Sequence, residues 1–197
     1  MRLEILKELE QDDPKLEIPW ASPEDPNLRY QDLKGHLELI PELEEVLEFP
    51  ALGPFLQTLN AGDSVFRTAK CGVWSTQELS EEERAELGEA HKLGVYVDLV
   101  FEVEEFNFAV EHYLRLGEKL EGILASAEGS AQAEFTIRRC IFHDKNSWGY
   151  YATLFLHAYG KTSAGAAGEG TRALEALGRG LSSVSRILQA RAAGTNS

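Results

Sequence analysis

Residues 133–159 read AEFTIRRCIFHDKNSWGYYATLFLHAY, and they carry the strongest structural signal in the chain. Two runs rich in β-branched and aromatic residues, 133–142 and 148–159, flank the polar connection 143–147. Such runs are typical of strands, and a polar connection of this length is typical of a hairpin with a longer loop. We therefore expect an antiparallel hairpin over this stretch.

An earlier part of the chain predicts a second pair of strands. Residues 65–74 are typical of a strand, and residues 95–103 alternate apolar with polar side chains, which indicates a half-buried strand. Between them, Ser80-Glu81-Glu82-Glu83 has the pattern of a capping box, with acids where the helix dipole favours them. We expect a short acidic helix near residues 80–90.

Helical periodicity appears before, between and after these strand pairs. Pro41 and Pro50 are typical first-turn prolines of short helices, and the four glycines within residues 160–170 predict a flexible link. The apolar residues that predict two longer helices are Phe106, Val110, Tyr113, Leu120 and Leu124, then Leu174, Leu177, Leu181, Val184 and Leu188. The chain thus predicts an α+β fold with an antiparallel sheet of about four strands and helices packed on one face, in the order α-β-β-α-β-β-α.

A chain of 197 residues fits one domain with an added arm. We assign residues 1–31 to an N-terminal arm, a short helix suggested by Leu3, Leu6 and Leu9 followed by an extended proline-rich segment. Residues 32–193 are expected to form a single α+β domain, and residues 194–197 a frayed tail. The sequence leaves open whether the arm docks on its own domain or on a neighbouring copy.

The distribution of charge limits the partners. Residues 1–130 carry 29 acidic against 11 basic side chains, and residues 131–197 carry 4 against 8, for a chain total of −14. An acidic front repels nucleic acid and anionic membranes, but it can attract the basic back, a second copy or an unlike protein. No apolar run approaches the roughly 18 residues of a membrane span, and the charged N-terminus does not fit a signal peptide. We expect a cytoplasmic protein with reduced cysteines.

No motif identifies a reaction. Gly160-Lys161-Thr162 lacks the glycine that a phosphate-binding loop needs five residues earlier, where Phe155 stands. The five histidines include no i, i+4 pair, and Cys71 and Cys140 are far apart in sequence, so no metal site is expected. We accordingly predict no catalytic residue, no cofactor and no metal.

One surface remains as a candidate for function, the side of the sheet that the helices leave open. If Val95 and Val97 point into the core, the alternating residues point outward, and the hairpin adds a polar and aromatic face. A histidine near a carboxylate and an arginine can transfer protons or hold an anion, whereas cross-strand pairs can also simply stabilise a sheet. The candidate residues for a ligand or partner surface are Tyr96, Asp98, Arg138, Tyr151, His157 and Tyr159.

These observations favour a small acidic, non-catalytic interaction protein, chaperone-like or inhibitor-like (as immunity proteins are), that acts through its exposed sheet face. We expect it to bind a protein partner or a second copy of itself, as a homodimer. Its element order is similar to that of the acidic chaperones that bind type III secretion effectors, apart from the acidic helix between the first two strands. The alternative is a small-molecule-binding protein or enzyme that uses Asp98, Arg138 and His157 on the open face.

Overall fold

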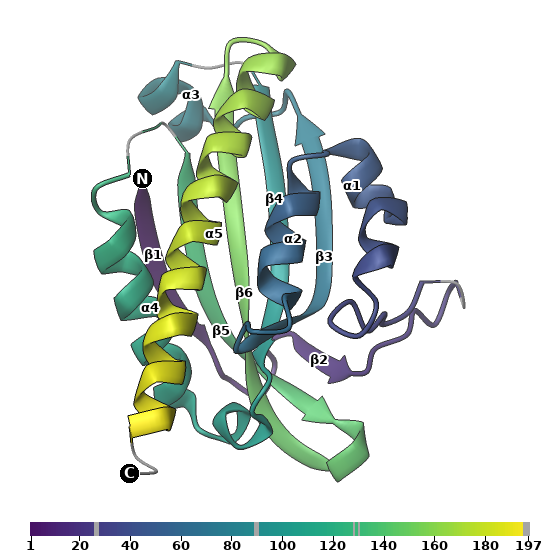
Figure 1. Cartoon of the computed structure of the whole chain (residues 1–197). Helices are drawn as coiled ribbons and strands as arrows, with labels where there is room; N and C mark the ends of the chain where they lie inside the picture. The colour runs from purple at the N-terminus through teal and green to yellow at the C-terminus, as the bar shows by residue number, and fades with distance from the viewer. Residues whose placement is uncertain (26–27, 89–90, 128, 130, 195–197) are drawn as a thin grey trace.

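The computed structural model describes residues 1–25, 28–88, 91–127, 129 and 131–194, which form one mixed sheet with its longer helices on one face (Figure 1). The strands follow the order β1-β5-β6-β4-β3, and β2 pairs with β5 beyond β1. All neighbours are antiparallel except β1 and β2, which run parallel to β5. The strands are β1 (Arg2–Glu8), β2 (Lys15–Ile18), β3 (Phe66–Thr76), β4 (His91–Phe101), β5 (Gln132–Phe142) and β6 (Ser147–Gly160).

The predicted hairpin is confirmed as β5 and β6, which pair from Gln132 and His157 to Phe142 and Ser147. Its connection is a short 3-10 turn, η3 (His143–Lys145), that ends at Asn146 in the left-handed region, with φ at 46°. Because β6 also pairs with β4, and β4 with β3, both predicted strand pairs belong to a single sheet.

Three helices cover one face of this sheet (Figure 1): α2 (Leu52–Asn60), α4 (Val110–Leu124) and α5 (Ser163–Gly194). Their apolar stripes meet the inward side chains of the strands, and this layer holds the main core. Fully buried members include Leu56 of α2, Leu120 of α4 and Phe135 of β5. The smaller elements are η1 (Leu37–Glu42), α1 (Glu44–Glu48), α3 (Glu81–Leu87) and η2 (Glu104–Phe108).

The prediction of a helix over the first ten residues is wrong, and so is that of about four strands in the order α-β-β-α-β-β-α. Arg2–Glu8 is a strand along the edge of β5, which makes the sheet six-stranded. Its alternation fits this role, because Leu3 is buried in the core and Ile5 packs against it. Tertiary pairing thus overrides the helical spacing of the leucines, which a segment this short could not sustain alone.

The N-terminal arm joins the sheet and then crosses it. After β2, Ile18 packs with Val100, Cys140 and Tyr151 in a second apolar cluster on the face opposite the helices. The indole Nε1 of Trp20 then donates a 2.7 Å hydrogen bond to the carbonyl oxygen of Ala69 on β3. The arm therefore covers this face at the end of the sheet nearest the β5–β6 turn. The boundary between arm and domain at residue 31 stays a prediction.

The prediction of a flexible link over residues 160–170 is also wrong. Helix α5 begins at Ser163, and Thr162 Oγ1 accepts a 3.1 Å hydrogen bond from the amide of Gly165 in its first turn. Of the predicted frayed tail, Gly194 belongs to α5 and the last three residues lie outside the described part of the chain.

Candidate functional site

The sheet face opposite α2, α4 and α5 carries side chains that the strand register arranges in rows. We call this surface the open face. It is bounded by α3 at one end and by the arm at the other. From the α3 end, its rows are Trp74–Gly94–His157–Gln132, then Gly72–Tyr96–Phe155–Glu134, then Lys70–Asp98–Thr153–Thr136.

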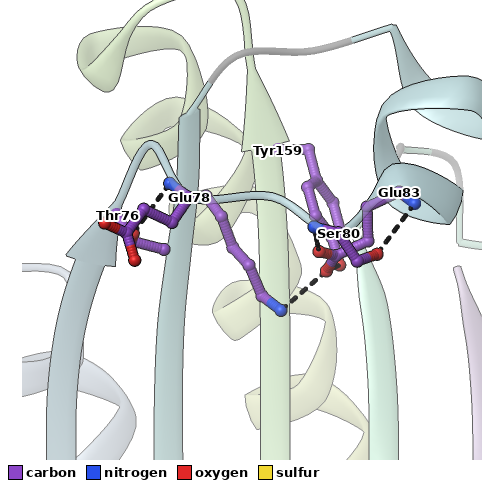
Figure 2. Close-up of polar contacts among 6 residues, drawn as sticks. Thr76, Glu78, Ser80, Glu83 and Tyr159 are labelled. Carbon is purple, nitrogen blue, oxygen red and sulfur yellow. Dashed lines mark hydrogen bonds and ion pairs between the residues drawn. The ribbon is translucent and has the colours of Figure 1, made fainter.

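Helix α3 is fixed on this face by Glu83 (Figure 2). Its carboxylate Oε1 accepts hydrogen bonds from Lys92 Nζ at 2.7 Å and from the Tyr159 hydroxyl at 2.8 Å. The same side chain completes the predicted capping box, since Ser80 N donates to Glu83 Oε2 at 2.8 Å and Glu83 N donates to Ser80 Oγ at 3.1 Å. The bond from Lys92, followed by those from Ser80 and Tyr159, outweighs desolvation and lowers the pKa of Glu83 to about 2.

Removal of this cap should loosen α3. We expect Ser80→Ala to lower the free energy of unfolding by about 1 kcal/mol, because the amide of Glu83 in the first turn loses its hydrogen-bond acceptor. For a chain of this size the melting temperature should fall by about 2–4 °C in differential scanning calorimetry. Ser126→Ala, at an exposed serine whose hydroxyl donates to the carbonyl oxygen of Ile123, is the control and should leave the melting temperature unchanged. Equal shifts in the two variants would contradict the role of the cap.

A chain of hydrogen bonds crosses the other end of the open face. Arg138 Nε donates to Glu8 Oε2 at 2.6 Å, and Arg138 Nη1 donates to Thr153 Oγ1 at 2.9 Å. Thr153 Oγ1 in turn donates to Asp98 Oδ1 at 2.6 Å. Asp98 is only 6% exposed, and this burial raises its pKa to about 6, although Thr153, Arg138 and Lys70 favour the charged form.

His157 does not join Asp98 and Arg138. Asp98 lies opposite Thr153, so His157 lies four residues farther along β6, about 13 Å away at the rise of a strand. Burial lowers the pKa of His157, which leaves its ring neutral at pH 7. Among the described residues the ring nitrogens make no hydrogen bond. The geometry therefore separates the predicted acid–base set into a carboxylate–arginine pair and a distant neutral imidazole.

His157 belongs instead to a closed circuit of four half-buried rings, which we call the aromatic cluster: Trp74, Tyr96, Phe155 and His157. The ring centroids are 6.5 Å apart for Trp74 and Tyr96, and 6.1 Å for Tyr96 and Phe155. They are 6.4 Å apart for Phe155 and His157, and 5.9 Å for His157 and Trp74, which meet edge to face. Each contact is within the range in which aromatic pairs attract one another.

Two glycines determine how the cluster sits on the sheet. A Cβ atom at Gly94 would lie 2.1 Å from both Cε2 and Cζ2 of Trp74 and 2.7 Å from Cδ2, so the indole lies flat on the backbone of β4. A Cβ atom at Gly72 would lie 2.3 Å from Cε1 of Tyr96. Each ring therefore leans over the glycine that faces it on the neighbouring strand. Trp74 was not among the site residues predicted from the sequence, and its pairing with a glycine on the neighbouring strand is the signal that could have identified it.

The six candidate residues of the sequence prediction all lie on the open side, but they are not equally accessible. Tyr151 and Tyr159 are 4% and 2% exposed, because the arm covers the first and α3 contacts the second. Asp98 is buried, and only Tyr96, Arg138 and His157 are half exposed. The accessible part of the face is therefore the aromatic cluster with Arg138 at its border.

Two cavities lie away from this face. One, of about 420 Å³, runs between α2 and α5 and is lined by Phe55, Leu174 and Arg179 among others. The other, of about 340 Å³, lies near Phe49 and His91. Within the described ranges, no group of three histidine, cysteine or acidic side chains is placed to hold a metal ion.

Comparison of the chain with known protein families, characterised proteins and solved structures found no match. None of the helices in the described part of the chain is long and apolar enough to cross a membrane. A functional proposal therefore depends on the geometry of the open face.

Proposed function

We propose that this chain is an acidic, non-catalytic binding protein that holds a protein partner on its open face. The observation that supports this is the aromatic cluster, whose four half-exposed rings lie on the strands between α3 and the arm. Aromatic residues are enriched at protein interfaces, because they bury a large apolar area at low entropic cost. Glycines at two positions of the face let the rings of Trp74 and Tyr96 lie against the backbone of the neighbouring strand.

The polar groups of the face support binding over catalysis. Arg138 already donates hydrogen bonds to Glu8 and Thr153, and Asp98 accepts one from Thr153, so these polar groups satisfy one another's hydrogen bonds. A catalytic site needs a nucleophile or base within reach of a substrate, with an orienting partner. His157, the expected base, has a lowered pKa and lies four residues from Thr153 along β6.

The partner is an unlike protein, as for a chaperone or an inhibitor, or a second copy in a homodimer. A standard interface buries about 800 Å² on each partner, so a partner would extend beyond the aromatic cluster onto its surroundings. The total charge of −14 opposes association of two identical copies through acidic surfaces and favours an unlike, basic partner.

A photo-crosslinker placed on the face tests the proposal. p-Benzoylphenylalanine at Phe155 keeps an aromatic ring within the cluster, and the same residue at Ile187, 42% exposed on α5, is the matched control. In the native host we expect light to produce a discrete protein adduct from position 155 and none from position 187. Equal yields from both positions, or no adduct combined with a strictly monomeric solution mass, would refute the proposal.

A second candidate is favoured by one observation, the raised pKa of Asp98. A buried carboxyl group that titrates near neutral pH is a common mark of ligand and active sites. If a small ligand or substrate uses this group, Asp98→Asn should abolish its binding while the adduct at position 155 persists. Loss of the adduct in Asp98→Asn would instead show that the carboxyl group supports the protein-binding surface.

A further inference from the structure

Several aromatic rings of this molecule already carry a cation from the chain itself. Lys70 Nζ lies 4.8 Å from the ring centroid of Trp20, and Lys15 Nζ lies 5.6 Å from that of Trp148. In two further pairs, Arg138 lies 5.3 Å from the ring centroid of Phe155 and Lys92 Nζ lies 5.7 Å from that of Tyr159. All four distances are within the roughly 6 Å at which a cation is attracted to a ring face.

Trp74 and Tyr96 differ from this pattern. In the part of the chain that the structure describes, no lysine or arginine lies over either ring. One plane of the Trp74 indole rests on the backbone at Gly94, so the half-exposed ring presents its other plane outward. His157 meets this indole edge-on, at an interplanar angle of 75°. The tryptophan face, which is the strongest of the aromatic binders of cations, is therefore left without one.

Carboxylates lie in the surroundings of Tyr96. Burial raises the pKa of Tyr96, and the acids Asp98 and, more weakly, Glu45 of α1 raise it further. In the row that contains Tyr96, Glu134 lies two strands away, opposite Phe155. A positive charge placed over Tyr96 would be attracted by these acids as well as by the ring.

We propose that Trp74 and Tyr96 receive a cationic side chain, an arginine or lysine, from a basic segment of the protein partner. This inference deepens the proposed function and rests on it. The partner's chemistry follows from the two ring faces, the acids around Tyr96 and the net charge of −18 over residues 1–130. The partner side chain would repeat on Trp74 the contact that Lys70 makes on Trp20 and Lys15 makes on Trp148.

The test uses the full chain and the peptide acetyl-Arg-Arg-Arg-Arg-amide, with binding measured by isothermal titration calorimetry at low ionic strength. We expect Trp74→Leu to weaken binding by about twofold to thirtyfold, the range of a cation–π contact. Trp148→Leu is the matched control, because Trp148 is 56% exposed and already carries Lys15. Its affinity should equal that of the unaltered chain, and the citrulline version of the peptide should not bind measurably.

A further variant keeps the result independent of folding defects. Trp74→Phe retains a ring at the site, so it should keep more of the affinity than Trp74→Leu, with both melting curves recorded. Equal affinities of Trp74→Leu and Trp148→Leu, undiminished binding of the citrulline peptide, or no binding of tetra-arginine would each overturn the cation inference. Binding of tetramethylammonium in the absence of tetra-arginine binding would also overturn it, in favour of a small-molecule site. The adduct at position 155 does not depend on a cation, so the proposed function can stand if this inference fails.

Discussion

Gly160→Ala should be among the most destabilising single-methyl substitutions in this protein. A Cβ atom at Gly160 would lie 2.3 Å from the backbone nitrogen of Ala166 and 2.6 Å from the carbonyl carbon of Gly165. These are backbone atoms of the first turn of α5, so no side chain can rotate away, and the helix must move off the end of β6. We expect the free energy of unfolding to fall by about 3 kcal/mol or more, the upper range of overpacking.

Urea unfolding provides the measurement, and the chain offers a matched control. Gly122 lies within α4 and has no atom within 4 Å of the position of an added Cβ. Gly122→Ala should raise the free energy of unfolding by up to about 1 kcal/mol, because alanine has the higher helix propensity. The two identical chemical changes should thus move the midpoint in opposite directions. A midpoint for Gly160→Ala that matches or exceeds that of the unaltered chain would show that β6 and α5 are not in close contact.

This contact also explains one failure of sequence-based prediction. Four glycines within residues 160–170 indicated a flexible link, since glycine lowers helix propensity. In the structure Gly160 ends β6 and the other three lie in α5. Gly160 and Gly170 allow close packing: a Cβ at Gly170 would lie 2.7 Å from a methyl carbon of Leu93. A glycine can therefore mark either a flexible segment or a place where two elements pack closely. Only the packing partners, some of which are distant in sequence, show which of these two roles a glycine has.

Elements with strong local signals were predictable. The hairpin of β5 and β6, the apolar stripe of α4 and the capping box at Ser80 each depend on residues close in sequence. Strand β1 was not predictable in this way, because its conformation depends on the edge of β5, 130 residues away at the pair Arg2 and Gln132. The same segment carries leucines at helical spacing and the alternation of Leu3 and Ile5 that suits a strand. Pairing with β5 decides in favour of the strand.

On the open face, too, local features were predictable from the sequence and features that depend on pairing between strands were not. Alternation along single strands correctly placed Asp98, Arg138 and His157 on one side of the sheet. It could not give the register between strands, which brings Asp98 and Arg138 to Thr153 and leaves His157 with Trp74. Nor could it show that the arm covers Tyr151. Side-chain direction is local information, whereas distance across a sheet is not.

The buried carboxyl group of Asp98 should make stability depend on pH in an unusual direction. Burial raises its pKa from 3.8 in the unfolded chain to about 6 in the folded one. Between these values the folded protein binds more protons than the unfolded chain, so the contribution of Asp98 to stability falls as pH rises from about 4 to about 6. Most carboxylates act oppositely: the pKa of Glu83 is lowered to about 2, and its contribution is lost as pH falls below about 4.5.

Comparison with Asp98→Asn isolates this one group, because other titrating groups act in both proteins. The asparagine Oδ1 can still accept the hydrogen bond from Thr153, and it carries no charge to desolvate. We expect the free energy of unfolding of the variant, relative to the unaltered chain, to rise by about 2 kcal/mol between pH 4 and pH 8. Urea unfolding at a series of pH values measures this difference. Asp144→Asn, at an exposed aspartate of η3, is the control variant measured over the same range. A flat difference for Asp98→Asn would mean that Arg138 and Lys70 fully offset the cost of burying the charge, and that the carboxylate remains ionised beneath the proposed binding surface.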